Sequence, residues 1–201
     1  MIRCVISDLG KVIIFFDNNI FFKKIANYSP FSKEEIQELT SSHFNLVESF
    51  DRGKMTPEAF YNQVVKILEA RIDYDNFCSI YNDVFFLNPP VLRIMKKLKK
   101  NYRLILLSNT DVMRFGFIKR KFPEAMIFDE YVLSYEVGFM KPHPQIYKVA
   151  LKKAGFGAKE CIFIDDREEN IEAAAKLGIN GIHMGPLTDL EAVLKKMGLS
   201  F

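Results

Sequence analysis

The sequence predicts an α/β fold in which a parallel sheet carries helices on both faces and a small all-helical unit follows the first strand. An apolar run opens the chain, and residues 18–86 then show helical spacing. From about residue 88 onward, short apolar runs alternate with helical segments. Such alternation is typical of a parallel sheet covered on both faces. A length of 201 residues suits one domain with a modest insertion.

The chain opens with a predicted strand. Residues 2–7 form an apolar run that ends at Asp8, and Gly10 follows two residues later. An apolar run that stops at a polar residue and a glycine indicates a strand entering a tight loop.

Helix-start signals mark the inserted unit. Ser32 is followed three residues later by Glu35, which is the pattern of a capping box. Thr56 stands before Pro57, so a capping hydroxyl precedes a proline at the first helical position. These signals, with apolar residues at helical spacing after them, predict helices in this region.

The remainder of the chain is expected to return to the sheet through a linker, Asn88-Pro89-Pro90. The elements expected after it are a helix over 91–98, a strand over 103–107, a helix over 115–122, a strand over 131–133, a helix around 146–150, a strand over 161–164, a helix over 171–178, a strand over 181–184 and a helix over 190–197. We therefore expect residues 18–86 to form one unit and residues 1–17 with 87–201 to form the other.

Charge and composition argue against nucleic-acid binding. The net charge is +3, from 28 basic and 25 acidic residues. The densest basic cluster is Lys96, Lys97, Lys99 and Lys100. It ends a helix-like stretch, where cations favour the helix dipole and solvent, and no stripe of aromatic and Arg residues accompanies it.

The cysteines and the apolar runs indicate a cytoplasmic protein. Cys4, Cys78 and Cys161 are odd in number and widely spaced, so they predict neither a disulfide framework nor a metal site. A reducing compartment is the simplest inference. The sequence shows no signal peptide pattern and no apolar run near eighteen residues, so no membrane association is expected. The oligomeric state is not predicted.

Polar residues gather at the predicted strand ends. Asp8, Ser108, and Asp165 with Asp166 each follow an apolar run. In parallel sheets, ligands bind beyond the carboxyl ends of the strands. An aspartate in such a place is also a common turn former, but two adjacent carboxylates repel each other, and a hard cation relieves that repulsion. Mg²⁺ prefers oxygen ligands, and we expect Asp8 and Asp166 to supply them.

Lys141 stands in the proline-bracketed segment Lys141-Pro142-His143-Pro144. It is either a loop lysine in solvent or a cation held near the acids, where it offsets the charge of a phosphate and of Asp8. Ser108 and the backbone amides after it lie where a strand hands over to a helix, a natural anion site. Together these residues predict phosphoryl transfer in which Asp8 attacks phosphorus.

Four segments, in order, resemble the motifs of the haloacid dehalogenase-like hydrolases. They are Val5-Ile6-Ser7-Asp8-Leu9-Gly10-Lys11-Val12, Leu106-Leu107-Ser108-Asn109-Thr110, Lys141-Pro142-His143-Pro144 with Ile146-Tyr147, and Phe163-Ile164-Asp165-Asp166 with Asn170 and Ala174. The resemblance spans nearly the whole chain. It implies a Rossmann-like core with a helical cap inserted after the first motif, and residues 18–86 fit that cap.

The resemblance also implies roles for the acids. Asp8 is expected to be the nucleophile and a metal ligand, and Asp166 to ligate Mg²⁺ directly. Asp165 is expected to act on the metal through water. The backbone carbonyl of Gly10 is expected to complete the protein ligands.

The remaining motif residues are expected to serve the substrate. The resemblance implies that Ser108 and Asn109 bind the substrate and that Lys141 both binds it and takes part in catalysis. The expected partner is a small phosphorylated molecule.

Gly10 departs from the family pattern. Most phosphatases of the family place a second aspartate there, as the acid that protonates the leaving group. A branch of bacterial sugar-phosphate phosphatases, including one active on α-D-glucose 1-phosphate, has a similar Asp-Leu-Gly-Asn-Val motif, with Asn where this chain has Lys11. Our hypothesis is that the substrate tolerates the missing acid, as an anomeric phosphate does. A substrate hydroxyl, a water or a cap residue such as His43 would otherwise supply the proton.

Two other functions remain open from sequence. Haloacid dehalogenases also lack the second aspartate, but their aspartate attacks carbon without magnesium, and Asp165-Asp166 favours the phosphatase. Alternatively, Gly10 marks a member that binds a phosphorylated metabolite without turnover. The expected function is a Mg²⁺-dependent phosphatase of a small phosphorylated metabolite, with sugar phosphates as candidate substrates.

Overall fold

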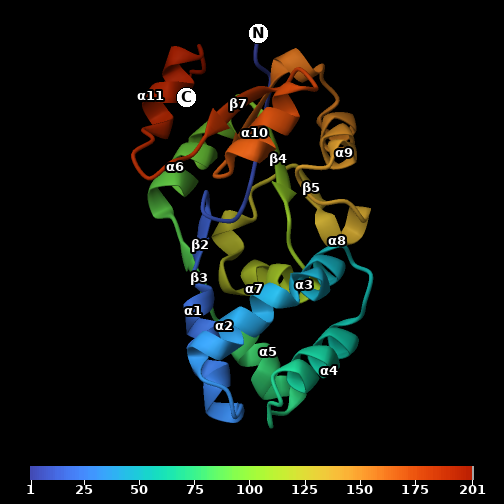
Figure 1. Ribbon diagram of the computed structural model, residues 1–201. Coiled ribbons are helices and arrows are strands. Elements are labelled where there is room, and N and C mark those ends of the chain that lie inside the picture. The colour runs from blue at the N-terminus through green and yellow to red at the C-terminus, as the bar shows by residue number, and fades with distance from the viewer. Residues whose placement is uncertain (201) are drawn as a thin grey trace.

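A five-stranded parallel sheet forms the centre of the protein. The computed structural model describes residues 1–200, and its strands lie in the order β5-β4-β1-β6-β7 (Figure 1). They are β1 (Cys4–Ser7), β4 (Arg103–Ser108), β5 (Glu130–Leu133), β6 (Cys161–Asp165) and β7 (Asn180–His183). Each strand is parallel to its neighbours. The predicted α/β fold is confirmed.

Helices cover both faces of this sheet, because successive strand side chains point to opposite sides. Val5 on β1 belongs to an apolar cluster with residues of α6 (Pro89–Leu98), α7 (Val112–Lys121) and α11 (Leu190–Lys196). Ile6, the next residue, belongs to a second cluster with residues of α9 (Pro144–Ala154) and α10 (Glu168–Ala175). Burial on both sides explains why the central strands are continuous apolar runs in the sequence.

The inserted helices, which we call the cap, lie below the carboxyl ends of the strands in Figure 1. They are α1 (Asn18–Ile25), α2 (Lys33–Ser42), α3 (Phe44–Asp51), α4 (Pro57–Ile67) and α5 (Tyr74–Asn82). The capping box of Ser32 and Glu35 is present, and Thr56 accepts a hydrogen bond from the N–H of Ala59. Both predicted helix starts are confirmed.

An antiparallel ribbon joins the cap to the sheet domain. β2 (Ile14–Phe16) pairs with β3 (Phe85–Leu87), so both crossings of the chain run side by side. Two strands of three residues give too short a pattern to be recognised in the sequence. The division of the chain at residues 17/18 and 86/87 stays a prediction.

Aromatic residues form the interior of the cap. The rings of Phe50 and Phe60 stack with centroids 4.2 Å apart, and those of Phe77 and Tyr81 stack at 5.6 Å. Such pairs add to the stabilisation from area burial. Part of the unusual Phe content, 19 residues, is therefore used to hold the cap together.

The linker expected at residues 88–90 was placed wrongly in part. Pro89 and Pro90 form the first turn of α6, where a proline's missing N–H costs nothing.

Four short elements were not predicted: η1 (Ala26–Tyr28), η2 (Pro123–Ala125), α8 (Ser134–Val137) and η3 (Ala158–Glu160). Within residues 1–200, no helix combines the length and apolar character needed to cross a bilayer.

The loop between α3 and α4 approaches the sheet domain at Gly53. Its φ of +67° lies in the left-handed region, and a Cβ placed on it would lie 2.1 Å from the carbonyl oxygen of Tyr135 in α8. Real Cβ atoms do not approach a backbone oxygen so closely, so only glycine permits this contact between cap and sheet domain.

Gly53→Ala should therefore destabilise the protein more than a matched glycine substitution. Gly155→Ala is the control, because Gly155 has a φ of +73° and open space around its Cβ position. The control should lose about 1–2 kcal/mol of unfolding free energy from backbone strain. Gly53→Ala should lose about 1–3 kcal/mol more from overpacking. Denaturant unfolding measures both, and equal losses would mean that the loop can withdraw from Tyr135 freely.

Candidate active site

Asp8 lies at the carboxyl end of β1, the central strand of the sheet. β4 pairs with β1 on one side and β6 on the other, so residues that follow these three strands meet at one edge. The N–H of Asp8 donates to the carbonyl of Ile164 at 2.8 Å. The N–H of Leu9 donates to Oδ1 of Asp8 at 2.7 Å. These bonds fix a carboxylate that is only 8% exposed.

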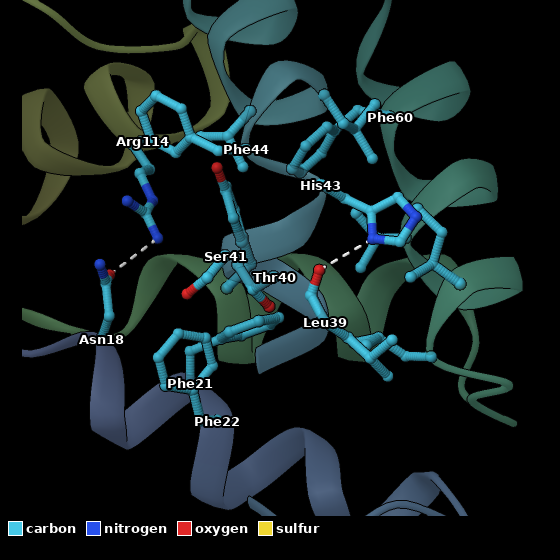
Figure 2. Close-up of a pocket in the computed structure, with 16 residues that line it drawn as sticks. Asn18, Phe21, Phe22, Leu39, Thr40, Ser41, His43, Phe44, Phe60 and Arg114 are labelled. Atoms are coloured by element: carbon cyan, nitrogen blue, oxygen red, sulfur yellow. Dashed lines mark hydrogen bonds between the residues drawn. The ribbon is translucent and has the colours of Figure 1, made fainter. Parts of the chain in front are cut away.

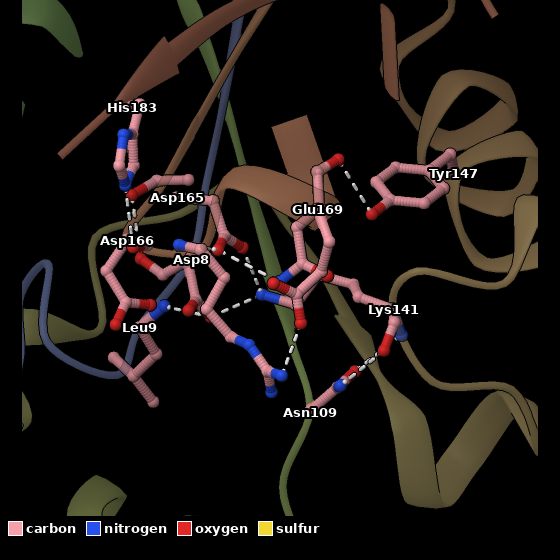
Figure 3. Close-up of polar contacts among 12 residues, drawn as sticks. Asp8, Leu9, Asn109, Lys141, Tyr147, Asp165, Asp166, Glu169 and His183 are labelled. Atoms are coloured by element: carbon pink, nitrogen blue, oxygen red, sulfur yellow. Dashed lines mark hydrogen bonds and ion pairs between the residues drawn. The ribbon is translucent and has the colours of Figure 1, made fainter. Parts of the chain in front are cut away.

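Lys141 joins two of the acids. Its Nζ lies 2.7 Å from Oδ1 of Asp8 and 2.7 Å from Oδ2 of Asp165, and its side chain is 2% exposed (Figure 3). A buried ammonium of this kind depends on its carboxylate partners, because the loss of one leaves an uncompensated charge. The predicted role of Lys141 as a cation held at the acids agrees with this geometry, and its alternative as a solvated loop residue does not.

The protonation equilibria reflect burial and these contacts. Burial raises the pKa of Asp8 to about 6, because the attraction of Lys141 offsets the lost hydration only in part and Asp165 adds repulsion. Burial acts to lower the pKa of Lys141, but the two carboxylates outweigh it and the net pKa is raised. Lys141 is therefore charged throughout the neutral range, and Asp8 is ionised above about pH 6.

Asp165 has little capacity left for another ligand. Its Oδ1 accepts hydrogen bonds from the N–H of Arg167 and from Nδ2 of Asn170, both at 2.9 Å. Its Oδ2 accepts from Lys141. Asp166 differs, because its side chain is 17% exposed and has one charged neighbour at 3.7 Å, the Nζ of Lys11.

The three carboxylates fit a divalent cation. One oxygen from each of Asp8, Asp165 and Asp166 lies within 4.8 Å of the others. Three carboxylates share one buried ammonium, so the cluster keeps an excess of negative charge, which a bound cation would neutralise. The free capacity of Asp8 and Asp166 suits direct ligation, and the occupied oxygens of Asp165 suit contact through water.

Asn109 holds the loop that carries Lys141. Its Nδ2 donates to the carbonyl of Lys141 at 2.9 Å, and its Oδ1 accepts from the N–H of Lys141 at 2.8 Å. Ser108, before it, is 3% exposed at the end of β4. The next residue, Thr110, exchanges hydrogen bonds with Ser134, with its N–H donating to Oγ at 2.9 Å. The site loops are thus tied to one another by reciprocal bonds.

A known protein family matches most of this chain. The model of the haloacid dehalogenase-like hydrolases matches residues 2–178. The chain belongs to the haloacid dehalogenase-like hydrolases. The family predicted from the four motifs is confirmed, and the protein is a hydrolase of that family.

Several known proteins are similar to this chain in sequence or in structure. The chain is 24% identical over 190 residues to D-ribitol-5-phosphate phosphatase of Bacteroides thetaiotaomicron, which covers 89% of each chain. It is 24% identical over 188 residues to drimenol cyclase drtB of Aspergillus calidoustus, but it spans only 34% of that protein's length. A crystal structure of the HAD family enzyme bt-2542 from B. thetaiotaomicron, in complex with magnesium and inorganic phosphate, is 28% identical. It superposes with a TM-score of 0.81 over 96% of this chain and 99% of that chain.

The histidines of this haloacid dehalogenase-like hydrolase have other contacts. His43 ends α2, where its Nδ1 lies 2.9 Å from the carbonyl of Leu39, and it lines a cavity in the cap (Figure 2). His143 caps α9 by accepting from the N–H of Gln145. His183 Nε2 lies 3.0 Å from the carbonyl of Asp166. None of these contacts supports His43 as the missing proton donor.

The structure shows contacts around the site that the sequence did not predict. The side chain of Asn109, expected to bind substrate, instead positions the backbone of Lys141, and its role in substrate binding stays a prediction. Arg114 and Tyr81 also meet Asp111 just beyond the site: the Tyr81 hydroxyl donates to Asp111 at 2.9 Å. Asp111 was detectable as a helix cap. The contacts of Tyr81 and Arg114 carried no sequence signal.

Lys141→Met should destabilise this hydrolase strongly at neutral pH. Removing the ammonium leaves two buried carboxylates unpaired, which costs about 3–5 kcal/mol of unfolding free energy. The loss should be smaller at pH 5, below the pKa of about 6 of Asp8, because a protonated carboxyl needs no cation. The exposed Lys148→Met on α9 is the control and should change stability by about 0.5 kcal/mol or less. Denaturant unfolding at pH 5 and 7 tests this, and a pH-independent loss would contradict it.

Proposed function

We propose that the protein is a Mg²⁺-dependent phosphatase that hydrolyses a small phosphorylated metabolite through an aspartyl-phosphate on Asp8. The observation that carries this proposal is the cluster of Asp8, Asp165 and Asp166 oxygens within 4.8 Å, beside the buried ammonium of Lys141. A cation and an ammonium on one edge of the sheet would together hold a phosphoryl group against a carboxylate nucleophile.

Two relatives support the reaction class. The bt-2542 structure holds magnesium and inorganic phosphate, and the related B. thetaiotaomicron protein is named for the hydrolysis of D-ribitol 5-phosphate. Sugar phosphates, which the first motif suggested, belong to the same class of small phosphate monoesters.

The proposed role of each residue follows from how many of its oxygens or donors are not already used in hydrogen bonds. Asp8, Asp166 and the carbonyl of Gly10 would hold Mg²⁺, which supplies charge neutralisation at the phosphate oxygens. Asp165 holds Lys141 in place, because its own oxygens are occupied by hydrogen bonds. Lys141 and the amides after Ser108 would then bind the transferring group, while the carboxylate of Asp8 attacks phosphorus.

The loop after Asp8 carries no acid at position 10, where most phosphatases of the family place one. Position 10 is glycine, and a Cβ there would lie 3.2 Å from Cε1 of Phe16. The space that a side chain at position 10 would enter is therefore bordered by an aromatic ring. General acid–base help contributes about 10²- to 10⁴-fold, so the proposed enzyme should depend strongly on how well the alcohol leaves.

Asp8→Asn should abolish phosphate release while the protein stays folded. Acetyl phosphate and p-nitrophenyl phosphate are suitable probes, because neither requires an acid to assist its leaving group. Release should require Mg²⁺ and should stop on chelation. Release by Asp8→Asn at the wild-type rate would exclude the covalent mechanism. Binding of Mg²⁺ and phosphate without any release would identify a non-catalytic member, and chloride release from a haloacid without metal would identify a dehalogenase.

The rate should fall steeply as the leaving group becomes less acidic. In a series of substituted phenyl phosphates, kcat/KM should drop by about 10²-fold or more from the best to the poorest leaving group. Gly10→Asp in a Phe16→Ala background should flatten this dependence, because the smaller side chain makes room for the new carboxyl. Phe16→Ala alone is the control and should keep the steep dependence. A flat series in the wild type would show that another group already donates the proton.

A further inference from the structure

A cavity of about 190 Å³ lies between the cap helices α1, α2, α3, α4 and α5 and the core helix α7 (Figure 2). Its walls are mostly apolar and include Phe21, Leu39, Phe44, Val47, Phe60 and Val64. A cavity of about 150 Å³ with such a lining accepts benzene. By that comparison, this one has room for on the order of six to ten non-hydrogen atoms.

One end of the cavity is polar. Arg114 on α7 donates from its Nη2 to Oδ1 of Asn18 on α1 at 3.1 Å, and both residues line the cavity. The Arg114 guanidinium also stacks over the Tyr81 ring at 4.3 Å. Its Nε is buried without a hydrogen-bond partner. The polar end of the cavity is thus formed by Arg114 and Asn18, and most of the remaining wall is apolar.

The charge of Arg114 is already balanced. Asp111 lies 3.9 Å from its Nε, and Asp51 at the end of α3 interacts with the same guanidinium. Burial raises the pKa of Asp51 to about 7, so Asp111 and the partly ionised Asp51 together leave no net positive field for a second anionic group. A ligand in this cavity should therefore be uncharged, with at most a hydroxyl or carbonyl oxygen facing Arg114.

The cavity lies on the same side of the sheet as the acids. Asn18 begins α1, which follows the loop from Asp8 through β2. Arg114 lies in the first turn of α7, which follows Ser108 at the end of β4. Figure 1 shows α7 directly beneath the carboxyl ends of the strands, with the cap helices beyond it.

We propose that this cavity receives the alcohol portion of the substrate, and that the substrate is the monophosphate ester of an uncharged, mainly apolar alcohol of about six to ten non-hydrogen atoms. The inference rests on the proposed phosphatase function and narrows its substrate class. A sugar or polyol would bury several hydroxyls against Phe and Val side chains without partners, which is unfavourable.

The reaction balances without an additional reactant. A carboxylate oxygen of Asp8 forms a bond to phosphorus while the bond between phosphorus and the alcohol oxygen breaks. The released alkoxide takes a proton from water. A second water then attacks the aspartyl-phosphate, releasing inorganic phosphate and restoring Asp8. The apolar part of the alcohol stays in the cavity until the cap releases it.

A homologous series of straight-chain primary alkyl phosphates tests the proposal, because the leaving oxygen is chemically the same in every member. kcat/KM should rise about fourfold per methylene, which corresponds to about 0.8 kcal/mol of burial, and then fall once the cavity is full. D-Ribitol 5-phosphate, also a primary phosphate, is the polar comparison and should be at least tenfold poorer than the best alkyl ester. A flat series, or a preference for D-ribitol 5-phosphate, overturns the proposal.

Cavity-filling variants locate the effect. Val64→Phe, or Val47→Phe if the first does not fold, should move the optimum to a shorter chain. Gln63→Phe, on an exposed position of the same helix α4, should leave the optimum unchanged. An unchanged optimum in both folded cavity variants would show that the chain binds elsewhere.

Hydrolysis of acetyl phosphate distinguishes a failure of this inference from a failure of the proposed phosphatase function. The leaving group of acetyl phosphate is too small to need the cavity, so the wild type and Gln63→Phe should hydrolyse it at the same rate, and Asp8→Asn should not hydrolyse it. If the wild type fails on acetyl phosphate, the phosphatase proposal itself fails. If acetyl phosphate is hydrolysed but the alkyl series is flat, only the assignment of the cavity fails.

Discussion

The contact on which the site depends is the buried ammonium of Lys141 between Asp8 and Asp165. It joins the ends of β1 and β6 to a loop that Asn109, after β4, holds by two hydrogen bonds. Burying such charges costs several kcal/mol per ion, which only good geometry and further hydrogen bonds offset. The hydrogen bonds from Arg167 and Asn170 to Asp165 supply that geometry. The acids are therefore held in place before a metal or substrate arrives, which is the condition for electrostatic catalysis.

Much of this architecture was predictable from local patterns. The central strands are apolar on both faces, so each appears as a continuous run, and the alternation with helices predicts a parallel sheet. The carboxyl ends of parallel strands share one edge, so Asp8, Ser108 and the Asp165-Asp166 pair could be placed together without coordinates. Helix starts at Ser32 and Thr56 were predictable because a cap hydrogen bond spans only three residues.

The parts that escaped prediction depend on contacts between distant segments. The amide of Asn109 bonds a backbone 32 positions away, and Arg114 bonds Asn18 across 96 positions. Neither residue type indicates its partner from sequence alone. The β2–β3 ribbon escaped for a related reason, since each strand has three residues and their pairing spans the whole cap. The cavity is an extreme case, because its walls come from six helices and no single helix reveals it.

The glycine at position 10 and the mostly apolar cavity both bear on how charge is distributed around the site. The Lys11 ammonium lies 5.7 Å from the centre of the Phe16 ring and 3.7 Å from Asp166, so the Gly10 loop presents a cation and an aromatic ring to the acid cluster. An aspartate at position 10 would instead bring a fourth carboxylate against Phe16, where loss of water disfavours its ionised form. The charged groups of the acid cluster thus lie together at the ends of the strands, apart from the mutually balanced Arg114, Asp111 and Asp51 beside the cavity. The mostly apolar cap cavity provides the uncharged surroundings that the apolar alcohol of the proposed ester requires.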